Sequence, residues 1–214
     1  MYRWPVIIAL IAFPSAALTD DTGLRVNITP TLERVVVQHA GRAVTIMRNQ
    51  DEANTISPSY ARTSRDCPSF CVQPIVLAPG VETIGELEML DYLERATDPV
   101  NRLLVVDSRT EDWVANGTIP GSVNIPWTRL SPSAGADPFE LTEIFENTFG
   151  AIAQEGFWNF SDARTLVLFC NGNWCGQSPT NIRTLLKLGY PAHKLKWYRG
   201  GMQAWESLGL TVVR

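Results

Sequence analysis

The sequence predicts an α/β protein in which helices flank a central, mostly parallel sheet, preceded by a small β-rich N-terminal extension. From residue 80 onward, apolar runs typical of strands alternate with runs typical of helices, which is the pattern of a parallel sheet. Residues 103–106 are apolar throughout, as expected for a strand buried on both faces. Residues 32–48 instead hold two β-branched runs around a turn, which predicts a hairpin. The 214 residues suffice for one well-buried domain and an appendage.

The first residues predict a secretory signal over 1–17. One positive charge at Arg3 precedes an apolar run over 6–13, and small residues lead up to a cleavage site after Ala17. The alternative, a membrane anchor, needs roughly 20 apolar residues, and this run is much shorter. We therefore expect an exported, periplasmic protein without a membrane span after cleavage, whose thiols meet an oxidising compartment.

Residues 18–80 form the predicted β-rich extension. Its hairpin turns at Ala40-Gly41, and the adjacent His39 is expected to be an exposed turn residue. The polar stretch that follows ends at Cys67-Pro68-Ser69-Phe70-Cys71. A lone hairpin is marginally stable in water, so we do not expect this extension to fold alone.

Residues 81–214 form the predicted α/β domain. Leu87, Leu90 and Leu93, or alternatively Met89, mark the apolar face of its first helix. Ser178 and Pro179 suit the N-cap and first position of a later helix, which Gly189 ends. The expected elements in chain order are a helix over 86–95, a strand over 103–106 that ends in Asp107, a strand over 122–125, a helix over 138–152, a strand over 165–169, a helix from 178 to 188, a strand over 195–198 and a helix over 202–208.

The overall charge argues against two classes of partner. Eighteen Lys and Arg against 22 Asp and Glu give a net charge of −4, and no basic run stands out. We therefore expect neither nucleic acid nor an anionic membrane surface as a partner.

The chemistry is expected at the turn after the strand over 165–169. Cys170 follows this strand, and ligands of open α/β sheets bind at the carboxyl ends of the strands. The next helix begins close by, and its free N–H groups and positive dipole end lower the pKa of a thiol. Gly172 and Gly176 allow backbone amides to point inward as an anion-binding nest. Cys170 is thus a candidate nucleophile, the alternative being a buried, inert cysteine.

Three segments in this order resemble the rhodanese (sulfurtransferase) family, with Cys170 between the second and the third. They are Leu104-Val105-Val106-Asp107-Ser108-Arg109, Gly117-Thr118-Ile119-Pro120-Gly121-Ser122-Val123-Asn124-Ile125-Pro126 and Tyr198-Arg199-Gly200-Gly201-Met202-Gln203-Ala204-Trp205. The first resembles a strand that ends in Asp-x-Arg, the second a His-Ile-Pro-Gly-Ala-x-Asn-Ile-Pro signature, and the third a Gly-Gly-x-x-x-Trp element. The resemblance covers nearly all of the second region and none of the extension.

The resemblance implies a persulfide mechanism. Cys170 would take a sulfane sulfur from a small donor and pass it to a thiol or protein acceptor, without a metal or organic cofactor. The loop would cradle the persulfide through the substrate-binding candidates Asn171, Gly172, Asn173, Trp174, Gly176, Gln177 and Ser178. Asp107 and Arg109 would support the loop structurally as a partly buried ion pair.

The loop departs from the family in three ways. Seven residues separate Cys170 from Ser178, where the family usually has five. The loop contains no Arg or Lys, which argues against thiosulfate as donor unless Lys194, Lys196 or Arg199 supplies a cation. Gly176 stands where related phosphatases need an arginine, which argues against phosphatase activity.

The loop holds a second thiol at Cys175, five residues after Cys170. A loop of this length lets the two thiols meet, so Cys175 is a candidate resolving cysteine, or else a structural one. Cys67 and Cys71 are candidates for a local disulfide, for exchange with the Cys170 loop, or for a zinc or iron–sulfur centre formed by all four thiols. We favour no metal site, since nothing else in the sequence supports one.

Three functions therefore compete. The favoured one is an exported sulfurtransferase that carries sulfane sulfur on Cys170. The second is a thiol–disulfide oxidoreductase that needs both Cys170 and Cys175. The third is a catalytically silent binding module, in which the extension and the uncharged loop recognise a partner.

Overall fold

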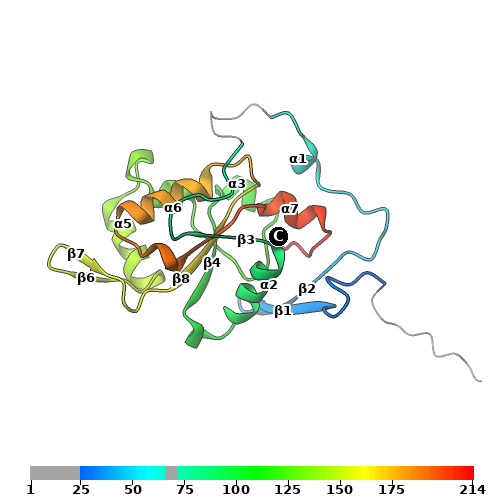
Figure 1. The fold of residues 1–214 in the computed structure, drawn as a ribbon, viewed down its shortest axis with the longest axis horizontal. Coiled ribbons are helices and arrows are strands. Elements are labelled where there is room, and N and C mark those ends of the chain that lie inside the picture. The colour runs from blue at the N-terminus through cyan, green and yellow to red at the C-terminus, as the bar shows by residue number, and fades with distance from the viewer. Residues whose placement is uncertain (1–24, 66–71) are drawn as a thin grey trace, which may run out of the picture.

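The computed structural model describes residues 25–65 and 72–214. The signal segment over 1–17 and the Cys67–Cys71 pair lie outside the described residues. Five parallel strands form the central sheet in the order β3-β9-β8-β4-β5 (Figure 1). Their bounds are β3 Glu82–Ile84, β4 Leu103–Asp107, β5 Val123–Asn124, β8 Thr165–Phe169 and β9 Leu195–Tyr198.

The register of this sheet brings its chemically important residues to one edge. Asp107 at the end of β4 pairs with Phe169 at the end of β8, which in turn pairs with Tyr198 at the end of β9. Cys170 and Arg199 follow directly, so both lie at the carboxyl edge of the sheet. The α/β class and the mostly parallel sheet that the sequence predicts are confirmed.

Helices cover both faces of the sheet because β8 points alternate side chains to opposite sides. Leu166 and Leu168 face α4 (Trp127–Leu130), α5 (Pro138–Glu143) and α6 (Gln177–Lys187). Val167 and Phe169 face α2 (Glu86–Arg95) and α7 (Gly201–Ser207). The remaining short elements are α1 Pro58–Ala61, α3 Glu111–Val114, η1 Pro99–Asn101, η2 Pro132–Ala134, η3 Ile144–Thr148 and η4 Ala192–Lys194.

The expected hairpin is present as β1 (Arg34–His39) and β2 (Arg42–Met47), with Ala40 and Gly41 at its turn. Val37 and Ile46 are fully buried in the same cluster as α2 and α7. The hairpin therefore completes the core of the α/β domain rather than forming one of its own.

His39 differs from its expected role as an exposed turn residue. It is half-buried, and its Nδ1 accepts a hydrogen bond from the N–H of Gly121 at 3.1 Å. Burial lowers the pKa of this imidazole below 6.5. Local sequence patterns could not predict this contact because it joins residues 82 positions apart.

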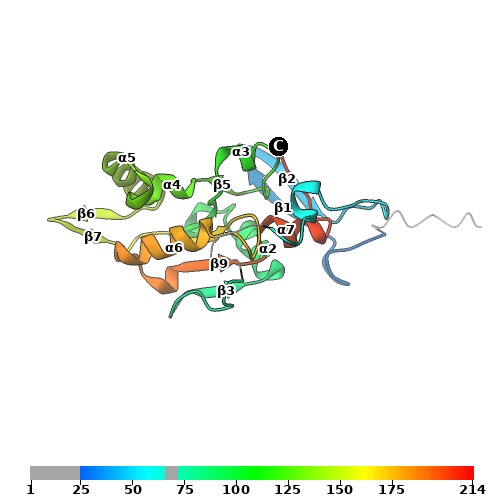
Figure 2. The ribbon, with the colours of Figure 1, turned by 90° about the horizontal axis from the view of Figure 1, so that it is seen from above.

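The helix expected over 138–152 ends early. After α5 the chain forms the π-turn η3, and Gly150, with a φ of +72°, turns it away from the helix. Ile152 then begins β6 (Ile152–Gln154), which pairs with β7 (Phe157–Asn159) in a hairpin that projects from the end of the molecule opposite the extension (Figure 2). No helix in the described parts of the chain could cross a bilayer.

Candidate active site

Cys170 lies directly after β8, and its side chain is turned into the protein. The residue is only 2% exposed, and its carbonyl accepts a hydrogen bond from Met202 N–H at 3.0 Å. The loop that it begins ends at Gly176, the N-cap of α6. Five residues, Asn171 through Cys175, therefore separate the thiol from the helix cap, because the helix begins one residue before Ser178.

Ser178 does not cap the helix, which corrects the sequence-based expectation. It lies in the first turn of α6, and its hydroxyl donates to Cys170 Sγ at 3.1 Å. The side chain is fully buried, so this hydrogen bond is shielded from water. Ser178 thus acts on the thiol rather than on the helix end.

Hydrogen bonds make Cys170 more acidic than an ordinary thiol. Burial alone would raise its pKa, but donors from the Cys175 thiol, the Ser178 hydroxyl and the backbone N–H groups of Ser178 and Gly172 lower that pKa to about 7. A large fraction of Cys170 is therefore thiolate at neutral pH. The thiolate is the nucleophilic form of cysteine.

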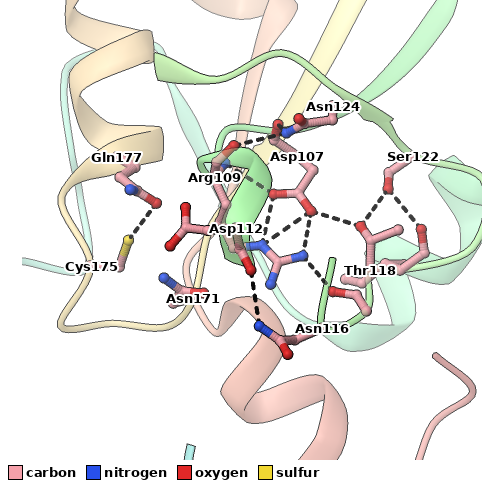
Figure 3. Close-up of polar contacts among 12 residues, drawn as sticks. Asp107, Arg109, Asp112, Asn116, Thr118, Ser122, Asn124, Asn171, Cys175 and Gln177 are labelled. Atoms are coloured by element: carbon pink, nitrogen blue, oxygen red, sulfur yellow. Dashed lines mark hydrogen bonds and ion pairs between the residues drawn. The ribbon is translucent and has the colours of Figure 1, made fainter. Parts of the chain in front are cut away.

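Cys175 is the protonated partner of this pair. Its hydrogen bond to Cys170, its burial and the negative charge on Cys170 all raise its pKa. Its thiol also contacts Gln177 Oε1 at 3.5 Å (Figure 3). Its carbonyl accepts a hydrogen bond from Gln73 Nε2 and, while Cys170 is protonated, another from the Cys170 thiol at 3.5 Å. Both cysteines are free thiols, as the structure describes them.

Helix α7 contacts residues 171–174 of the loop, which we call its outer limb. Gln203 N–H donates to the Asn171 carbonyl at 2.9 Å, and Trp174 Nε1 donates to Gln203 Oε1 at 3.0 Å. Gly201, with a φ of +55°, brings the start of α7 so close that a Cβ there would lie 2.7 Å from Gly172 N. The loop is therefore fixed by backbone contacts as well as by side chains.

Asp107 and Arg109 form a buried ion pair beneath the loop (Figure 3). Arg109 Nε donates to Asp107 Oδ1 at 2.8 Å, and Arg109 Nη2 donates to the Gly117 carbonyl at 2.8 Å. Thr118, which stands at the family's histidine position, donates to Asp107 Oδ2 at 2.7 Å. These contacts join the segment after β4 to the segment before β5, and neither side chain is hydrogen-bonded to Cys170 Sγ.

Sequence reasoning missed Tyr60, which reaches this network from the extension. Its hydroxyl accepts a hydrogen bond from Arg109 Nη1 at 2.9 Å and donates to Asn171 Oδ1 at 3.2 Å. Tyr60 lies in a polar, turn-rich stretch where no periodicity marks it. It connects the extension to the residue that follows Cys170.

The three cations considered as substitutes for a loop arginine lie in different places. Lys194 Nζ donates to the carbonyls of Phe160, Ser161 and Ala163, and Lys196 Nζ pairs with Glu82. Arg199 Nη2 donates at 3.1 Å to the carbonyl of Gln73, whose side chain in turn donates to the Cys175 carbonyl. None of the three cations is hydrogen-bonded to the Cys170 loop in the described structure.

Nothing in the described residues forms a metal site, because no group of three or more His, Cys, Asp and Glu side chains comes together there. Of the sequence-predicted residues, the structure gathers Gly172, Cys175 and Ser178 around the Cys170 thiol, and Gln177 contacts the Cys175 thiol. Asn173 and Trp174 instead belong to the outer limb and line a cavity.

Comparison with known proteins decides the family. The model of the rhodanese-like domain matches residues 89–208, more than half of the chain. The chain belongs to the rhodanese-like family. None of the curated proteins compared with it matches significantly.

Several solved structures resemble this rhodanese-like chain. The human single-domain sulfurtransferase TSTD1 is 23% identical, with a TM-score of 0.40 over 59% of this chain and 96% of its own. The Saccharomyces cerevisiae single-domain sulfurtransferase RDL2 is 17% identical, with a TM-score of 0.39 over 60% and 91%. A rhodanese-related protein from Thermoplasma volcanium is 15% identical, with a TM-score of 0.36 over 62% and 97%.

Proposed function

We propose that this rhodanese-like protein is a sulfurtransferase that carries sulfane sulfur as a persulfide on Cys170. The observation that carries the proposal is the set of hydrogen-bond donors around Cys170 Sγ, which lowers its pKa to about 7. The same donors suit the negative charge of a persulfide. Family membership supports the reaction class.

The proposed reaction has two displacement steps. The Cys170 thiolate attacks the outer sulfur of a persulfide donor R–S–SH, the donor's S–S bond breaks, and R–S⁻ leaves. An acceptor thiolate then attacks the outer sulfur of Cys170–S–SH, and Cys170 returns as a thiolate. Each step makes one S–S bond and breaks another, so no oxidant or reductant is consumed.

Mass spectrometry tests this proposal directly. The protein is treated with a small persulfide, alkylated without reduction, and digested. We expect one additional sulfur on the Cys170 peptide, its loss in Cys170→Ser, and its retention in Cys175→Ser. Absence of added sulfur in the wild-type protein would refute the persulfide mechanism.

The second free thiol, which the Cys170 thiolate holds protonated in the same loop, favours a second candidate, thiol–disulfide exchange. In that case the protein alkylated without reduction carries a Cys170–Cys175 disulfide, and Cys175→Ser abolishes activity. A catalytically silent binding module differs from both, because Cys170→Ser would then still bind its partner. The same three samples separate all three candidates.

We also propose that the protein is exported after cleavage behind Ala17. Support comes from the basic, apolar and small-residue pattern of residues 1–17. Protein recovered from the periplasm of a Gram-negative expression host is expected to begin at Leu18. A retained Met1 or recovery from the cytoplasm alone would refute export.

A further inference from the structure

A cavity of about 420 Å³ lies between the extension and the outer limb of the Cys170 loop. Its walls include Arg62, Ser64 and Arg65 from the extension, Asn173 and Trp174 from the loop, and Gln203 from α7. Cavities of roughly 300–1,000 Å³ hold small organic ligands. The size suits a molecule larger than an inorganic sulfur anion.

The chemistry of this cavity favours a negative charge. Two arginines line it, and none of its described lining residues is Asp or Glu. The Arg65 guanidinium lies 4.0 Å from the centre of the Trp174 ring and donates through Nη2 to the Ser59 carbonyl. A guanidinium stacked in this way is held in place, and its planar N–H groups match a carboxylate.

The cavity is joined to the reactive loop by short contacts. Trp174 and Gln203 are hydrogen-bonded to each other at 3.0 Å, and Gln203 N–H binds the Asn171 carbonyl at 2.9 Å. Asn171 directly follows Cys170. A ligand in the cavity, beside the stacked Arg65 and Trp174, thus lies against the limb of the loop that begins at the thiol.

We propose that this cavity binds the carboxylate end of an organic thiol that accepts the sulfane sulfur from Cys170. The extension thereby supplies the cations that the loop lacks, through Arg65 and Arg62. The inference rests on the proposed persulfide function and names its acceptor class. The acceptor's thiolate attacks the outer sulfur of Cys170–S–SH, and the carboxylate stays unchanged in the cavity.

Two synthetic peptides test the acceptor class, namely acetyl-Cys-Gly-Glu with free carboxylates and acetyl-Cys-Gly-Gln-amide without them. The persulfidated protein is mixed with each peptide, and loss of the added sulfur from Cys170 is followed by mass spectrometry. We expect the acidic peptide to react about tenfold faster, the effect of one or more charge-assisted hydrogen bonds. Arg65→Gln, and more fully Arg62→Gln/Arg65→Gln, should remove this advantage and leave the amide peptide unaffected.

Arg34→Gln is the matched control, since Arg34 is exposed on the hairpin and pairs only with the neighbouring Glu33 in the described structure. It should keep the full advantage of the acidic peptide. Equal rates for both peptides on the wild-type protein would overturn the inference, as would equal losses for both peptides in Arg65→Gln. Either result leaves the persulfide function standing, because the sulfur would still load onto Cys170.

Equilibrium binding keeps the inference testable if no persulfide forms. The S-methylated forms of the two peptides are titrated into Cys170→Ser protein by calorimetry. Tighter binding of the acidic peptide, lost in Arg65→Gln, would support the cavity independently of turnover. Equal binding of the two peptides, or an advantage that survives Arg65→Gln, would refute it.

Discussion

At the scale of single residues, the acidity of Cys170 depends on neutral donors rather than on a nearby cation. Burial opposes the thiolate, while the Cys175 thiol, the Ser178 hydroxyl and two backbone N–H groups favour it. Hydrogen bonds to a charged group contribute about 1.5–3 kcal/mol each, so a few of them outweigh the cost of burial. The first turn of α6 supplies one of these N–H groups, that of Ser178.

The first prediction concerns the pH dependence of this thiol. Because only the thiolate reacts, the alkylation rate of Cys170 should rise with pH, reach half its maximum near pH 7 and fall tenfold per unit well below it. Ser178→Ala removes one donor and should raise the midpoint by about one pH unit. Peptide mass spectrometry with iodoacetamide pulses measures both. A wild-type midpoint near the ordinary cysteine value of about 8.5 would contradict the hydrogen-bonded thiolate.

The second prediction separates two roles of Cys175. Cys175→Ser keeps an O–H that can donate to Cys170, so the alkylation midpoint should stay near pH 7. Cys175→Ala removes the donor and should raise the midpoint. Both variants lose disulfide exchange. Sulfur transfer that is retained only in the serine variant would therefore identify Cys175 as a hydrogen-bond donor to Cys170. Equal midpoints in the two variants would show that its hydrogen bond is unimportant.

At the scale of elements, the loop is shaped by the start of α7 as much as by its own sequence. Gly201 has a φ of +55°, where L side chains are strained, and its α-carbon faces the loop backbone. Met202 and Gln203 donate N–H groups to the carbonyls of Cys170 and Asn171. The Gly-Gly-x-x-x-Trp element therefore has a physical function at the active-site loop.

The third prediction is that Gly201→Ala displaces the loop. A Cβ at this position would meet the backbone of residues 170–172, including Gly172 N at 2.7 Å. Overpacking of this kind costs about 1–3 kcal/mol of unfolding free energy, and sulfur loading of Cys170 should fall more than about tenfold. Denaturant unfolding and mass spectrometry measure the two effects.

Gly135→Ala is the control for this prediction. Gly135 has a similar positive φ of +87°, but a Cβ there would meet nothing within 4 Å. It should lose stability from backbone strain alone and keep full activity. Equal losses of activity in both variants would mean that contact with the loop is not the cause.

Local sequence patterns predicted most elements because the relevant physics is local. The strand over 165–169 is bounded as expected, and the helix over 86–95 and the hairpin turn at Ala40-Gly41 are also present. Features set by distant contacts were not accessible in this way. The Ser178 hydroxyl donates to Cys170 Sγ instead of capping the helix, and Tyr60 is hydrogen-bonded to Arg109, 49 residues away in the sequence.

At the scale of the whole molecule, the extension and the α/β domain share one core. Ile46 and Val37 are fully buried beside α2 and α7, and Ser57 N–H binds Glu206 Oε2 at 3.0 Å. Through Tyr60 and Gln73 the same extension contacts Asn171 and the Cys175 carbonyl. Folding of the extension and shaping of the active site are therefore coupled.

The fourth prediction follows from this shared core. Ile46→Ala leaves a cavity under the hairpin and should reduce the unfolding free energy by about 2–5 kcal/mol. Because both regions bury the same cluster, unfolding should remain a single transition, followed by tryptophan fluorescence and by circular dichroism together. Val36→Ala, at a 51% exposed position in the other strand of the hairpin, should change stability by less than about 0.5 kcal/mol. Two separate transitions, of which Ile46→Ala shifts only the first, would show instead that the extension folds on its own and that its contacts with the Cys170 loop are not required for the domain.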